Sequence, residues 1–464
     1  SELTSPPSTF QAERWVLAAH RLDLDSELLQ SDCLQAYIQS DLGGEVTFVE
    51  LPRDWWPASC FNADGTAKYK RPVFRLLKAL YGHPRAGEHW HDKIKGELKK
   101  IGAKEIEGWP SVYHDAKADV TLVLYVDDLV AKGPKKTLRG YLAKLREVID
   151  MDPPEPIEKY LGVHHDFKDG KDVAEYDLSM KDFFKSSCDA YTEKTGQSLK
   201  AAETPYAPEL PKEKTIELMK TPGRFGDHAP SLLMKPLYGA RAARPDLCVP
   251  IQQLSSEVTR WSAECDRRIH RMYCYIFGTT ELGLKGRLSR VPGTRFWLKL
   301  WPDADLAGNP FTAKSASGGW LELVDDKGNS FPISWGTKKQ DCTANHIAEA
   351  ETFSMSTWLR GDGLPAQVLL SLMLKRPVPL EILEDNSSCI VAVAKGYSPA
   401  MRYLPRADRI SLDFLCDTTT ETGNPKGDCR VKKVDTKEHK GDFFTKALNV
   451  NDFLVGRERI GLAG

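Results

Sequence analysis

One stretch near residue 125 restricts the fold more than any other part of the chain. An apolar run at 120–124 leads into Tyr-Val-Asp-Asp at 125–128, and a second apolar run follows at 129–131. Two β-rich segments around a short polar tip are typical of a β-hairpin. The sequence therefore predicts a hairpin with Asp127 and Asp128 side by side at its turn. Adjacent carboxylates repel each other, so this tip favours a divalent cation, although a solvated Asp-Asp turn explains four residues equally well.

Length and composition exclude several classes of protein. The chain has 464 residues, enough for about three domains, and a net charge of −1, so any nucleic-acid-binding surface has to be a local basic patch. Its ten cysteines form no Cys-x-x-Cys pair, which argues against structural zinc or a disulfide framework and indicates a reducing compartment. We expect no membrane span and no signal peptide, because no apolar run is long enough and the first residues lack the required pattern.

Hydrophobic periodicity predicts the main elements along the chain. Residues 201–235 are rich in proline and lysine and are predicted to be a connector. Gly102 is a plausible C-cap for the second predicted helix. Helices are predicted at 10–22, 90–101, 247–277, 344–359 and 366–374, and strands at 296–301, 319–324 and 380–383.

A metal-dependent phosphoryl-transfer site would need a further carboxylate facing the hairpin tip, since two hard cations require several oxygen ligands. Asp32 is the candidate, because it stands where an apolar strand turns into a helical pattern. A single aspartate at such a junction is more often a helix N-cap, and the local pattern leaves both interpretations open.

Several short motifs, taken together, resemble the reverse transcriptase of copia-type long-terminal-repeat retrotransposons. Asp32 opens the first of them, and the Tyr-Val-Asp-Asp stretch is similar to the polymerase signature of that family. The resemblance covers nearly the whole chain. The matching segments are 32–40, 51–52, 77–82 with Trp90, 125–128, 159–162, 244–247 and 277–279.

The resemblance implies roles for five residues in the first half. Asp32, Asp127 and Asp128 would hold two Mg²⁺ or Mn²⁺ ions and act as the catalytic carboxylates. Tyr37 would be the steric gate against a ribose 2′-hydroxyl, although an ordinary buried aromatic residue is the alternative. Arg85 stands where the family has glutamine, so it would contact the nucleotide through phosphate or would simply be a surface arginine.

A second set of acids lies in the α/β part of the chain, where the segments around them are similar to the ribonuclease H domain of the same retrotransposons. Carboxylates at strand ends and on a facing helix can hold metals at the edge of a sheet. The resemblance implies Asp303, Glu349, Asp385 and Asp442 as catalytic and metal-binding residues, again with two ions. Neighbouring acids, such as Glu351, are expected to be bystanders.

The implied fold is an α+β palm/fingers-type polymerase domain with a helical connection, followed by an α/β ribonuclease H-like domain. We expect a reverse transcriptase palm and partial fingers at 1–205, a largely helical thumb or connection at 206–292 and a ribonuclease H-like domain at 293–464. Because about thirty residues precede Asp32, we expect the family's N-terminal fingers segment to be missing.

The expected function is RNA-directed DNA polymerase with ribonuclease H activity. The alternative is a truncated or degenerate remnant that only cleaves RNA in a hybrid or only binds nucleic acid. Expected partners are an RNA template, a primer, an RNA–DNA hybrid and deoxynucleoside triphosphates, with no membrane and with the oligomeric state left open. The expected location is cytoplasmic, including virus-like particles, with the nucleus left open. Candidate basic patches, each of which could equally be a solvated helix face, are 95–100, 135–136 and 260–271.

Overall fold

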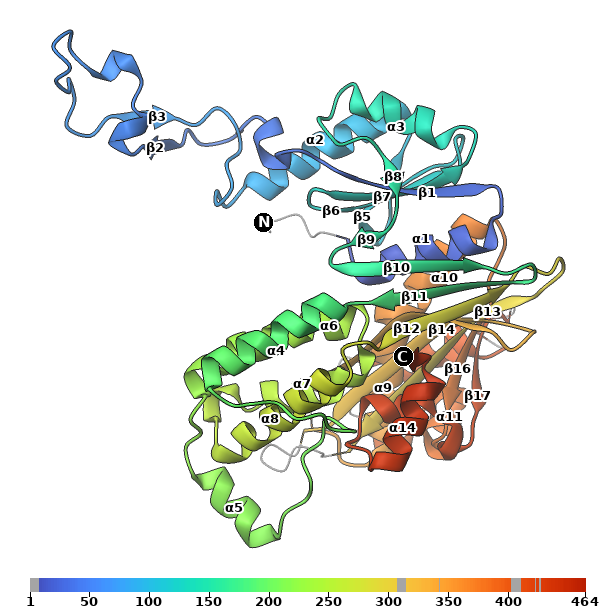
Figure 1. Cartoon of the computed structure of the whole chain (residues 1–464). Helices are drawn as coiled ribbons and strands as arrows, with labels where there is room; N and C mark the ends of the chain where they lie inside the picture. Colours follow the sequence, from blue (N-terminus) through green and yellow to red (C-terminus); the bar gives the residue numbers. More distant parts are fainter. Residues whose placement is uncertain (1–7, 307–313, 342, 402–409, 422, 425–426) are drawn as a thin grey trace. The chain divides into compact units, whose positions relative to one another are not determined.

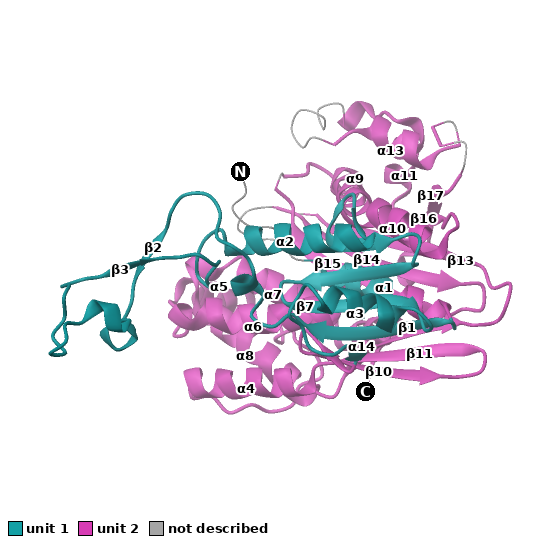
Figure 2. Ribbon diagram, turned by 90° about the horizontal axis from the view of Figure 1, so that it is seen from above, with its two compact units in different colours: residues 1–16, 24–157 teal, residues 17–23, 158–464 magenta. Residues whose placement is uncertain are grey.

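The computed structural model describes residues 8–306, 314–341, 343–401, 410–421, 423–424 and 427–464 (Figure 1). The fold is mixed α/β and divides into two compact units. The first unit comprises residues 1–16 and 24–157, and the second comprises residues 17–23 and 158–464 (Figure 2). Within the described ranges, none of the helices combines the length and apolar character that a membrane span requires.

A six-stranded antiparallel sheet forms the centre of the first unit, in the order β4-β5-β6-β7-β1-β8. The predicted hairpin is confirmed as β6 (Val120–Tyr125) and β7 (Asp128–Pro134). β7 then pairs with β1 (Ser26–Asp32), which brings a distant segment against the hairpin. The remaining strands are β4 (Lys104–Ile106), β5 (Trp109–Asp115) and β8 (Glu155–Pro156).

Two helices share a hydrophobic core with this sheet, α2 (Ala86–Ile101) and α3 (Leu138–Arg146). The prediction of a helix at 90–101 with Gly102 as its C-cap is confirmed, with Gly102 at φ 111°. The helix at 10–22 is also confirmed, as α1 (Phe10–Leu22). Two short strands, β2 (Phe48–Glu50) and β3 (Val73–Arg75), form a separate two-stranded antiparallel sheet.

In the second unit, an antiparallel sheet has the order β18-β12-β11-β10-β9. Its strands come from all three predicted domain ranges. The predicted domain boundaries stay a prediction. The strands are β9 (Lys159–Tyr160), β10 (Val163–Asp169), β11 (Val173–Ser179), β12 (Gly283–Ser289) and β18 (Leu462–Ala463).

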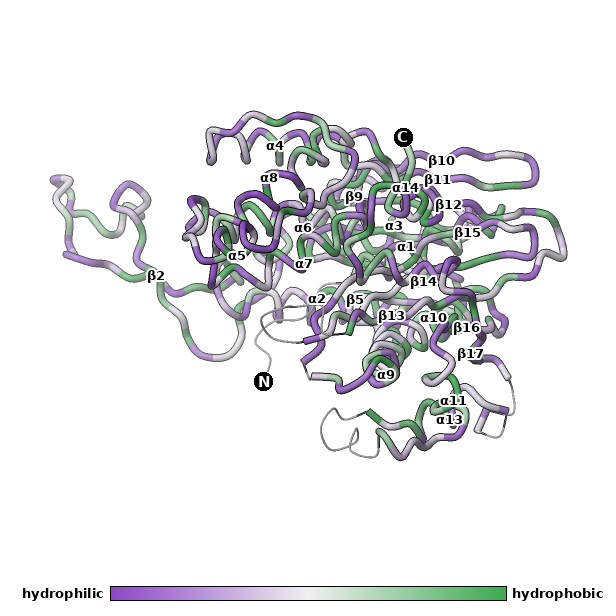
Figure 3. Tube along the Cα trace, turned by 90° about the horizontal axis from the view of Figure 1, so that it is seen from below, coloured by the Kyte–Doolittle hydropathy of each residue, from purple (hydrophilic) through white to green (hydrophobic). Residues whose placement is uncertain are grey.

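One connector prediction and one helix prediction in this unit are wrong. The expected connector at 201–235 contains α5 (Lys212–Lys220) and the start of α6 (Ala229–Ala242), because prolines there precede or open helices instead of interrupting them. The single helix expected at 247–277 is two helices, α7 (Cys248–Ser255) and α8 (Ala263–Gly278). These helices and α4 (Lys181–Thr195) mix hydrophobic and hydrophilic residues along their length (Figure 3).

A mixed sheet in the order β15-β14-β13-β16-β17 carries the C-terminal half of the second unit. β13, β14 and β15 are antiparallel neighbours, whereas β16 runs parallel to β13 and to β17. The three predicted strands are confirmed; the first two are each four residues longer than predicted, and the third is one residue longer. The strands are β13 (Phe296–Asp305), β14 (Ala316–Asp325), β15 (Ser330–Lys339), β16 (Leu380–Glu384) and β17 (Cys429–Lys433).

Helices cover this sheet, and the two predicted there are confirmed as α9 and α10. A π-helical turn, Leu359–Gly363, joins them. The short 3-10 helix η10 (Lys440–Phe444) contacts β13 and β14. The helices are α9 (Ile347–Trp358), α10 (Leu364–Leu374), α11 (Ser387–Lys395), α13 (Leu412–Thr419) and α14 (Val450–Arg459).

Candidate functional site

Three aspartates of the first unit lie next to one another where β1 ends and β7 begins. Asp32 is the last residue of β1 and Asp128 the first of β7, and their Cα atoms pair directly across the antiparallel ladder. The backbone N–H of Cys33 donates to the carbonyl oxygen of Asp127 at 2.8 Å, which fastens the hairpin turn to the end of β1. Asp32 is therefore a strand residue and not an N-cap; the residue before the following 3-10 helix, Ala36–Gln39, is Gln35.

The three charges act on one another. Burial raises the pKa of Asp128 to about 6, and the charges of Asp127 and Asp32 contribute to that rise. Burial and the charge of Asp127 also raise the pKa of Asp32 above its ordinary value. Three neighbouring carboxylates are a donor set that suits hard divalent cations, whose preferred ligands are oxygen atoms.

The turn that carries Asp127 is held in an unusual backbone conformation. Tyr125 and Asp128 are paired in the ladder, so the two loop residues are Val126 and Asp127, one position earlier than the predicted tip. Val126 has φ 61°, which is costly for a β-branched residue and persists only where the surroundings enforce it. Trp90 of α2 contributes to that enforcement, because its indole N–H donates to the carbonyl oxygen of Val126 at 2.7 Å.

The two predicted nucleotide-binding residues differ in their relation to this cluster. Tyr37 is half-buried, packs its ring against Tyr81 with centroids 4.6 Å apart, and has a pKa raised by burial and by the charge of Asp127. Arg85 directly precedes α2, where it ion-pairs with Glu88 at 2.8 Å. The structure thus brings Tyr37 close to the carboxylates, whereas the guanidinium of Arg85 is engaged by a neighbour on its own helix.

A second group of carboxylates forms at the mixed sheet. Asp303 lies near the end of β13, Asp385 follows β16, and Glu351 comes from α9. One carboxylate oxygen of each residue lies within 4.8 Å of the others. β13 and β16 are parallel neighbours, so their carboxyl ends meet at the same edge of the sheet, and α9 presents the third acid to that edge.

Asp303 and Glu351 are buried and Asp385 is half-buried, so the charged forms of these acids are poorly solvated. Burial raises the pKa of Asp303, Glu351 and the neighbouring Glu384. The charges of Asp303 and Asp385 raise the pKa of both glutamates further, and the charge of Asp442 does the same for Asp303. In the described part of the chain, Oε2 of Glu351 and Oε2 of Glu384 have no hydrogen-bond partner. Buried carboxylate oxygens without donors are rare, and they fit a site built to hold a cation.

The predicted residues Glu349 and Asp442 are placed differently. The carboxylate of Glu349 accepts hydrogen bonds from the backbone and side chain of Asn345 at 2.8 and 3.3 Å, at the start of α9, and lies outside the group around Asp303. Asp442 lies on η10 near enough to raise the pKa of Asp303, but it ion-pairs with Lys446. Sequence reasoning expected Glu351 to be a bystander; the structure places it in the group.

Several contacts fix the position of Asp303. The hydroxyl of Thr445 donates to its carboxylate, and the hydroxyl of Ser354 donates to its backbone carbonyl at 2.7 Å. His439 Nε2 bonds the carbonyl oxygen of Leu383 at 2.8 Å and thereby ties the segment before η10 to the end of β16. A Cβ at Gly441 would lie 2.6 Å from Cβ of Asp303 and 2.6 Å from Cε1 of His439, so only glycine fits there.

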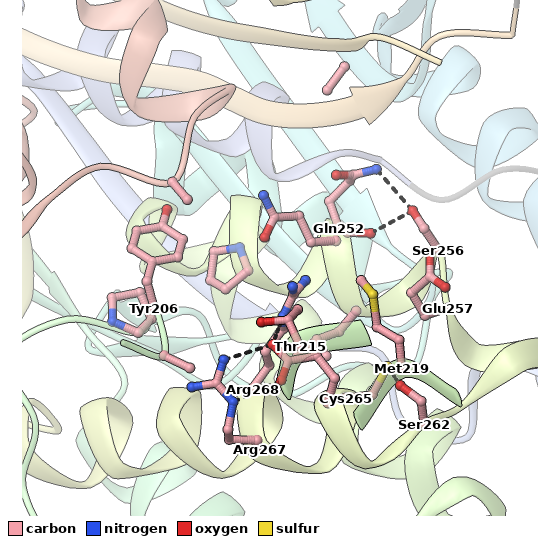
Figure 4. Close-up of a pocket in the computed structure, with 18 of the residues that line it drawn as sticks. Tyr206, Thr215, Met219, Gln252, Ser256, Glu257, Ser262, Cys265, Arg267 and Arg268 are labelled. Carbon is pink, nitrogen blue, oxygen red and sulfur yellow. Dashed lines mark hydrogen bonds and ion pairs between the residues drawn. The ribbon is translucent and has the colours of Figure 1, made fainter. Parts of the chain in front are cut away.

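A pocket of about 540 Å³ adjoins this group within the second unit. Asp305, two residues after Asp303, and Thr445 both line it. Gln252 of α7 and Arg267 and Arg268 of α8 line it from the helical side (Figure 4).

The predicted basic patches contain many paired charges. In the 260–271 patch, Arg267 and Arg268 both bind the buried carboxylate of Glu264, at 2.7 and 2.8 Å. In the 95–100 patch, Lys95 ion-pairs with Glu105. Such pairing reduces the net positive charge that these surfaces offer to a polyanion.

Comparisons with known proteins connect this geometry to a family. Residues 4–198 match the family described as reverse transcriptase (RNA-dependent DNA polymerase). The retrovirus-related Pol polyprotein from transposon TNT 1-94 of Nicotiana tabacum is 25% identical over 99% of this chain and 33% of that protein. The transposon Ty1-GR3 Gag-Pol polyprotein of Saccharomyces cerevisiae is 23% identical over 94% of this chain and 24% of that protein. The chain therefore spans a third or less of these two relatives.

Two further matches are shorter or weaker. A putative transposon Ty5-1 protein of Saccharomyces cerevisiae is 25% identical over 58% of this chain and 82% of that protein. The crystal structure of a prototype foamy virus protease–reverse transcriptase is matched over 92% of this chain and 45% of that chain at 10% identity, with a TM-score of 0.20, a likeness too weak to define the fold.

Proposed function

Residues 4–198 belong to the reverse transcriptase family, the whole chain is related to copia-type retrotransposon Pol polyproteins, and on this premise we propose that the protein is an RNA-directed DNA polymerase that also cleaves RNA in an RNA–DNA hybrid. The observation that carries the polymerase proposal is the convergence of Asp32, Asp127 and Asp128 at one hairpin turn. We propose a palm and partial fingers at 1–205, a helical connection at 206–292 and a ribonuclease H-like domain at 293–464.

In the polymerase, Asp32, Asp127 and Asp128 would bind the cations, since their oxygen atoms fit Mg²⁺ or Mn²⁺. Two such ions at either site would activate the attacking oxygen and offset the charge that develops on the leaving group. The contact between Trp90 and Val126 holds the turn that carries Asp127. Tyr37, half-buried beside these acids, would exclude the 2′-hydroxyl of a ribonucleotide.

Arg85 would bind the triphosphate of the incoming nucleotide. Its guanidinium is bidentate on the carboxylate of Glu88, and the same planar fork suits a phosphate group. Because the Arg85–Glu88 pair is half-exposed, exchanging the carboxylate for a phosphate costs little.

For the nuclease, we propose Asp303, Glu351 and Asp385 as the main cation-holding group, with Asp442 joining them. Support comes from the shared edge of β13 and β16 and from the unpartnered oxygen of Glu351 in the described part of the chain. Glu349 was implied by the resemblance to the family, but its hydrogen bonds to Asn345 favour a structural role at the start of α9. Thr445 and Ser354 would orient Asp303.

The partners that follow from this proposal are an RNA template, a primer, deoxynucleoside triphosphates and the resulting RNA–DNA hybrid. A cytoplasmic location, including virus-like particles, fits the relatives, which are transposon polyproteins.

Primer extension on an RNA template with Mg²⁺ or Mn²⁺ tests the polymerase. We expect Asp127→Asn to lower extension by a factor on the order of 100 or more, as loss of a metal ligand does. The matched control is Asp54→Asn, an exposed aspartate outside the cluster. If the wild-type chain extends no primer but cleaves a hybrid, the protein is a nuclease alone.

Cleavage of labelled RNA in an RNA–DNA hybrid tests the second activity. We expect Asp385→Asn to abolish cleavage and to leave primer extension intact. Asp417→Asn, which changes an exposed aspartate on α13, should leave both unchanged. A wild-type chain that leaves the hybrid intact with either ion would show the nuclease proposal to be wrong.

A further inference from the structure

Lys446 is a cation inside the second acidic group. Its ammonium ion-pairs with Asp442 and lies 4.0 Å from Oδ2 of Asp303. The side chain is 43% exposed, so it is anchored at the group while still open to solvent on one side. The carboxylates of Asp303 and Asp442 favour its charged form.

This contact decides what Asp442 can do. Asp303, Glu351 and Asp385 have oxygen atoms within 4.8 Å of one another, whereas Asp442, although its charge acts on Asp303, is not part of that set. Its Oδ1 is bound by Lys446. A carboxylate oxygen engaged by an ammonium is not available to a divalent ion, and two cations at this spacing repel each other.

We propose that Lys446 is a positioning residue that keeps Asp442 out of the cation-holding group until a nucleic-acid phosphate binds its ammonium. This inference rests on the proposed nuclease function. A phosphate oxygen can replace the carboxylate of Asp442 because an ammonium is a compact charge on a flexible four-carbon stem. Asp442 then turns to the other acids, so divalent-ion binding at this site becomes coupled to the presence of substrate.

The position of Thr445 indicates that Lys446 can change its partner from Asp442 to a phosphate while Asp303 stays in place. The hydroxyl of Thr445 bonds Asp303, and its side chain is buried, so this neighbour keeps Asp303 in place when the lysine leaves. A pocket is lined by Asp305 and by Thr445 and Ala447, the residues on either side of Lys446, so open volume lies next to the segment that carries the lysine.

Mn²⁺ binding, measured without nucleic acid by electron paramagnetic resonance of the free ion, tests the proposal. The parent is the full chain with Asp32→Asn, which weakens ion binding at the first cluster. Lys446→Met should bind Mn²⁺ about tenfold more tightly than the parent, a change typical of contacts around metal ligands. Lys437→Met, the same substitution at an exposed lysine nearby, should bind like the parent.

A second measurement tests the coupling. The probe is a hybrid whose RNA strand carries 2′-fluoro groups in place of 2′-hydroxyls. This hybrid should tighten Mn²⁺ binding by the parent by a similar factor, because binding of the two ligands is coupled. It should give no further gain in Lys446→Met. Lys446→Gln must behave as Lys446→Met, and Lys446→Arg, which keeps the charge, as the parent. These two variants also serve if Lys446→Met fails to fold.

Equal Mn²⁺ affinity in the parent, Lys446→Met and Lys446→Gln would overturn the inference. It would also be overturned if the hybrid still tightened Mn²⁺ binding by the two neutral variants. Mn²⁺ binding by the parent in either case leaves the nuclease proposal standing. If neither the parent nor the variants bind Mn²⁺ at this site, the nuclease proposal fails together with the inference.

Discussion

The Cα atoms of Asp32 and Asp128 are paired directly across the neighbouring antiparallel strands β1 and β7. Like charges directly opposite each other destabilise a sheet, and Asp127 adds a third charge at the same place. A divalent cation among the three carboxylates would remove that destabilisation. The stability of the ion-free first unit should therefore respond to these charges.

The first prediction concerns Asp128 and pH. The pKa of Asp128 is raised to about 6 in the folded protein, so the folded state binds this proton more tightly than the unfolded state. Its contribution to stability is fully present below the unfolded-state pKa of about 4 and is lost as pH rises through about 6. At pH 7 without metal, Asp128→Asn should raise the free energy of unfolding by about 1 kcal/mol, after a discount for solvent screening.

Urea denaturation between pH 4 and pH 8 measures this effect. The difference between Asp128→Asn and wild type should shrink as pH falls toward 4. Mn²⁺ should raise the melting temperature of wild type more than that of the variant. Asp189→Asn, which changes an exposed aspartate on α4, is the control, and a variant no more stable than wild type at pH 7 would contradict the prediction.

The second prediction concerns Trp90. Trp90→Phe keeps most of the buried ring but removes the N–H that donates to the carbonyl oxygen of Val126. The unfavourable φ of Val126 then loses one of its constraints, so we expect primer extension to fall about tenfold and the free energy of unfolding to fall by about 1–2 kcal/mol. Trp55→Phe, at a residue that is 72% exposed, should change neither.

The sequence predicted the elements whose signal is local. The hairpin at 120–131 follows from two apolar runs around a polar tip and helix α1 from helical spacing, and both are present. The pairing of Asp32 with Asp128 is different in kind, because no local pattern sets the register between β1 and β7. The resemblance to a family implied that these residues lie together. The structure shows how, because the antiparallel pairing of β1 and β7 places Asp32 opposite Asp128.

The sequence alone did not predict which of Glu349 and Glu351 joins the acidic group. The two glutamates are two positions apart on α9, so they face different sides of the helix. Which side meets the sheet depends on tertiary packing. A signal was present in the spacing, since Glu351, Ser354 and Trp358 recur at intervals of three and four residues, and the last two contact β13 or β14.

The third prediction separates these glutamates. Burial and neighbouring acids raise the pKa of Glu351, so in the ion-free protein it is protonated near neutral pH and Glu351→Gln should change the free energy of unfolding by less than about 1 kcal/mol. The same variant should lose hybrid cleavage and Mn²⁺ binding. Because ion binding must displace the proton, Mn²⁺ affinity of wild type should rise with pH between 6 and 8.

Glu349→Gln is the matched comparison for Glu351→Gln. It keeps an oxygen acceptor for Asn345 at the start of α9, so hybrid cleavage should stay within about threefold of wild type. Loss of Mn²⁺ binding in Glu349→Gln but not in Glu351→Gln would reverse our assignment.

The fourth prediction concerns a buried ion pair. Arg244 and Asp246 are fully buried, 2.7 Å apart, and the hydroxyl of Tyr275 also donates to Asp246. Asp246→Ala leaves the guanidinium without its counter-ion, so we expect the free energy of unfolding to fall by about 3–5 kcal/mol. Replacing both members, as Arg244→Met with Asp246→Leu, should restore part of that loss. Denaturant titration measures both, and a double variant less stable than Asp246→Ala would contradict the argument.

The fifth prediction uses the tight contact at Gly441. A methyl group there would lie 2.6 Å from Cβ of Asp303 and 2.6 Å from Cε1 of His439, both buried, so one of them must shift. We expect Gly441→Ala to lower hybrid cleavage by a factor on the order of 100, because carboxylate positions matter to a fraction of an ångström, while primer extension stays unchanged. Gly361→Ala adds the same methyl group where nothing lies within 4 Å and should leave cleavage intact. Normal cleavage by Gly441→Ala would contradict the prediction and would mean that the chain accommodates the methyl group without displacing the carboxylate of Asp303.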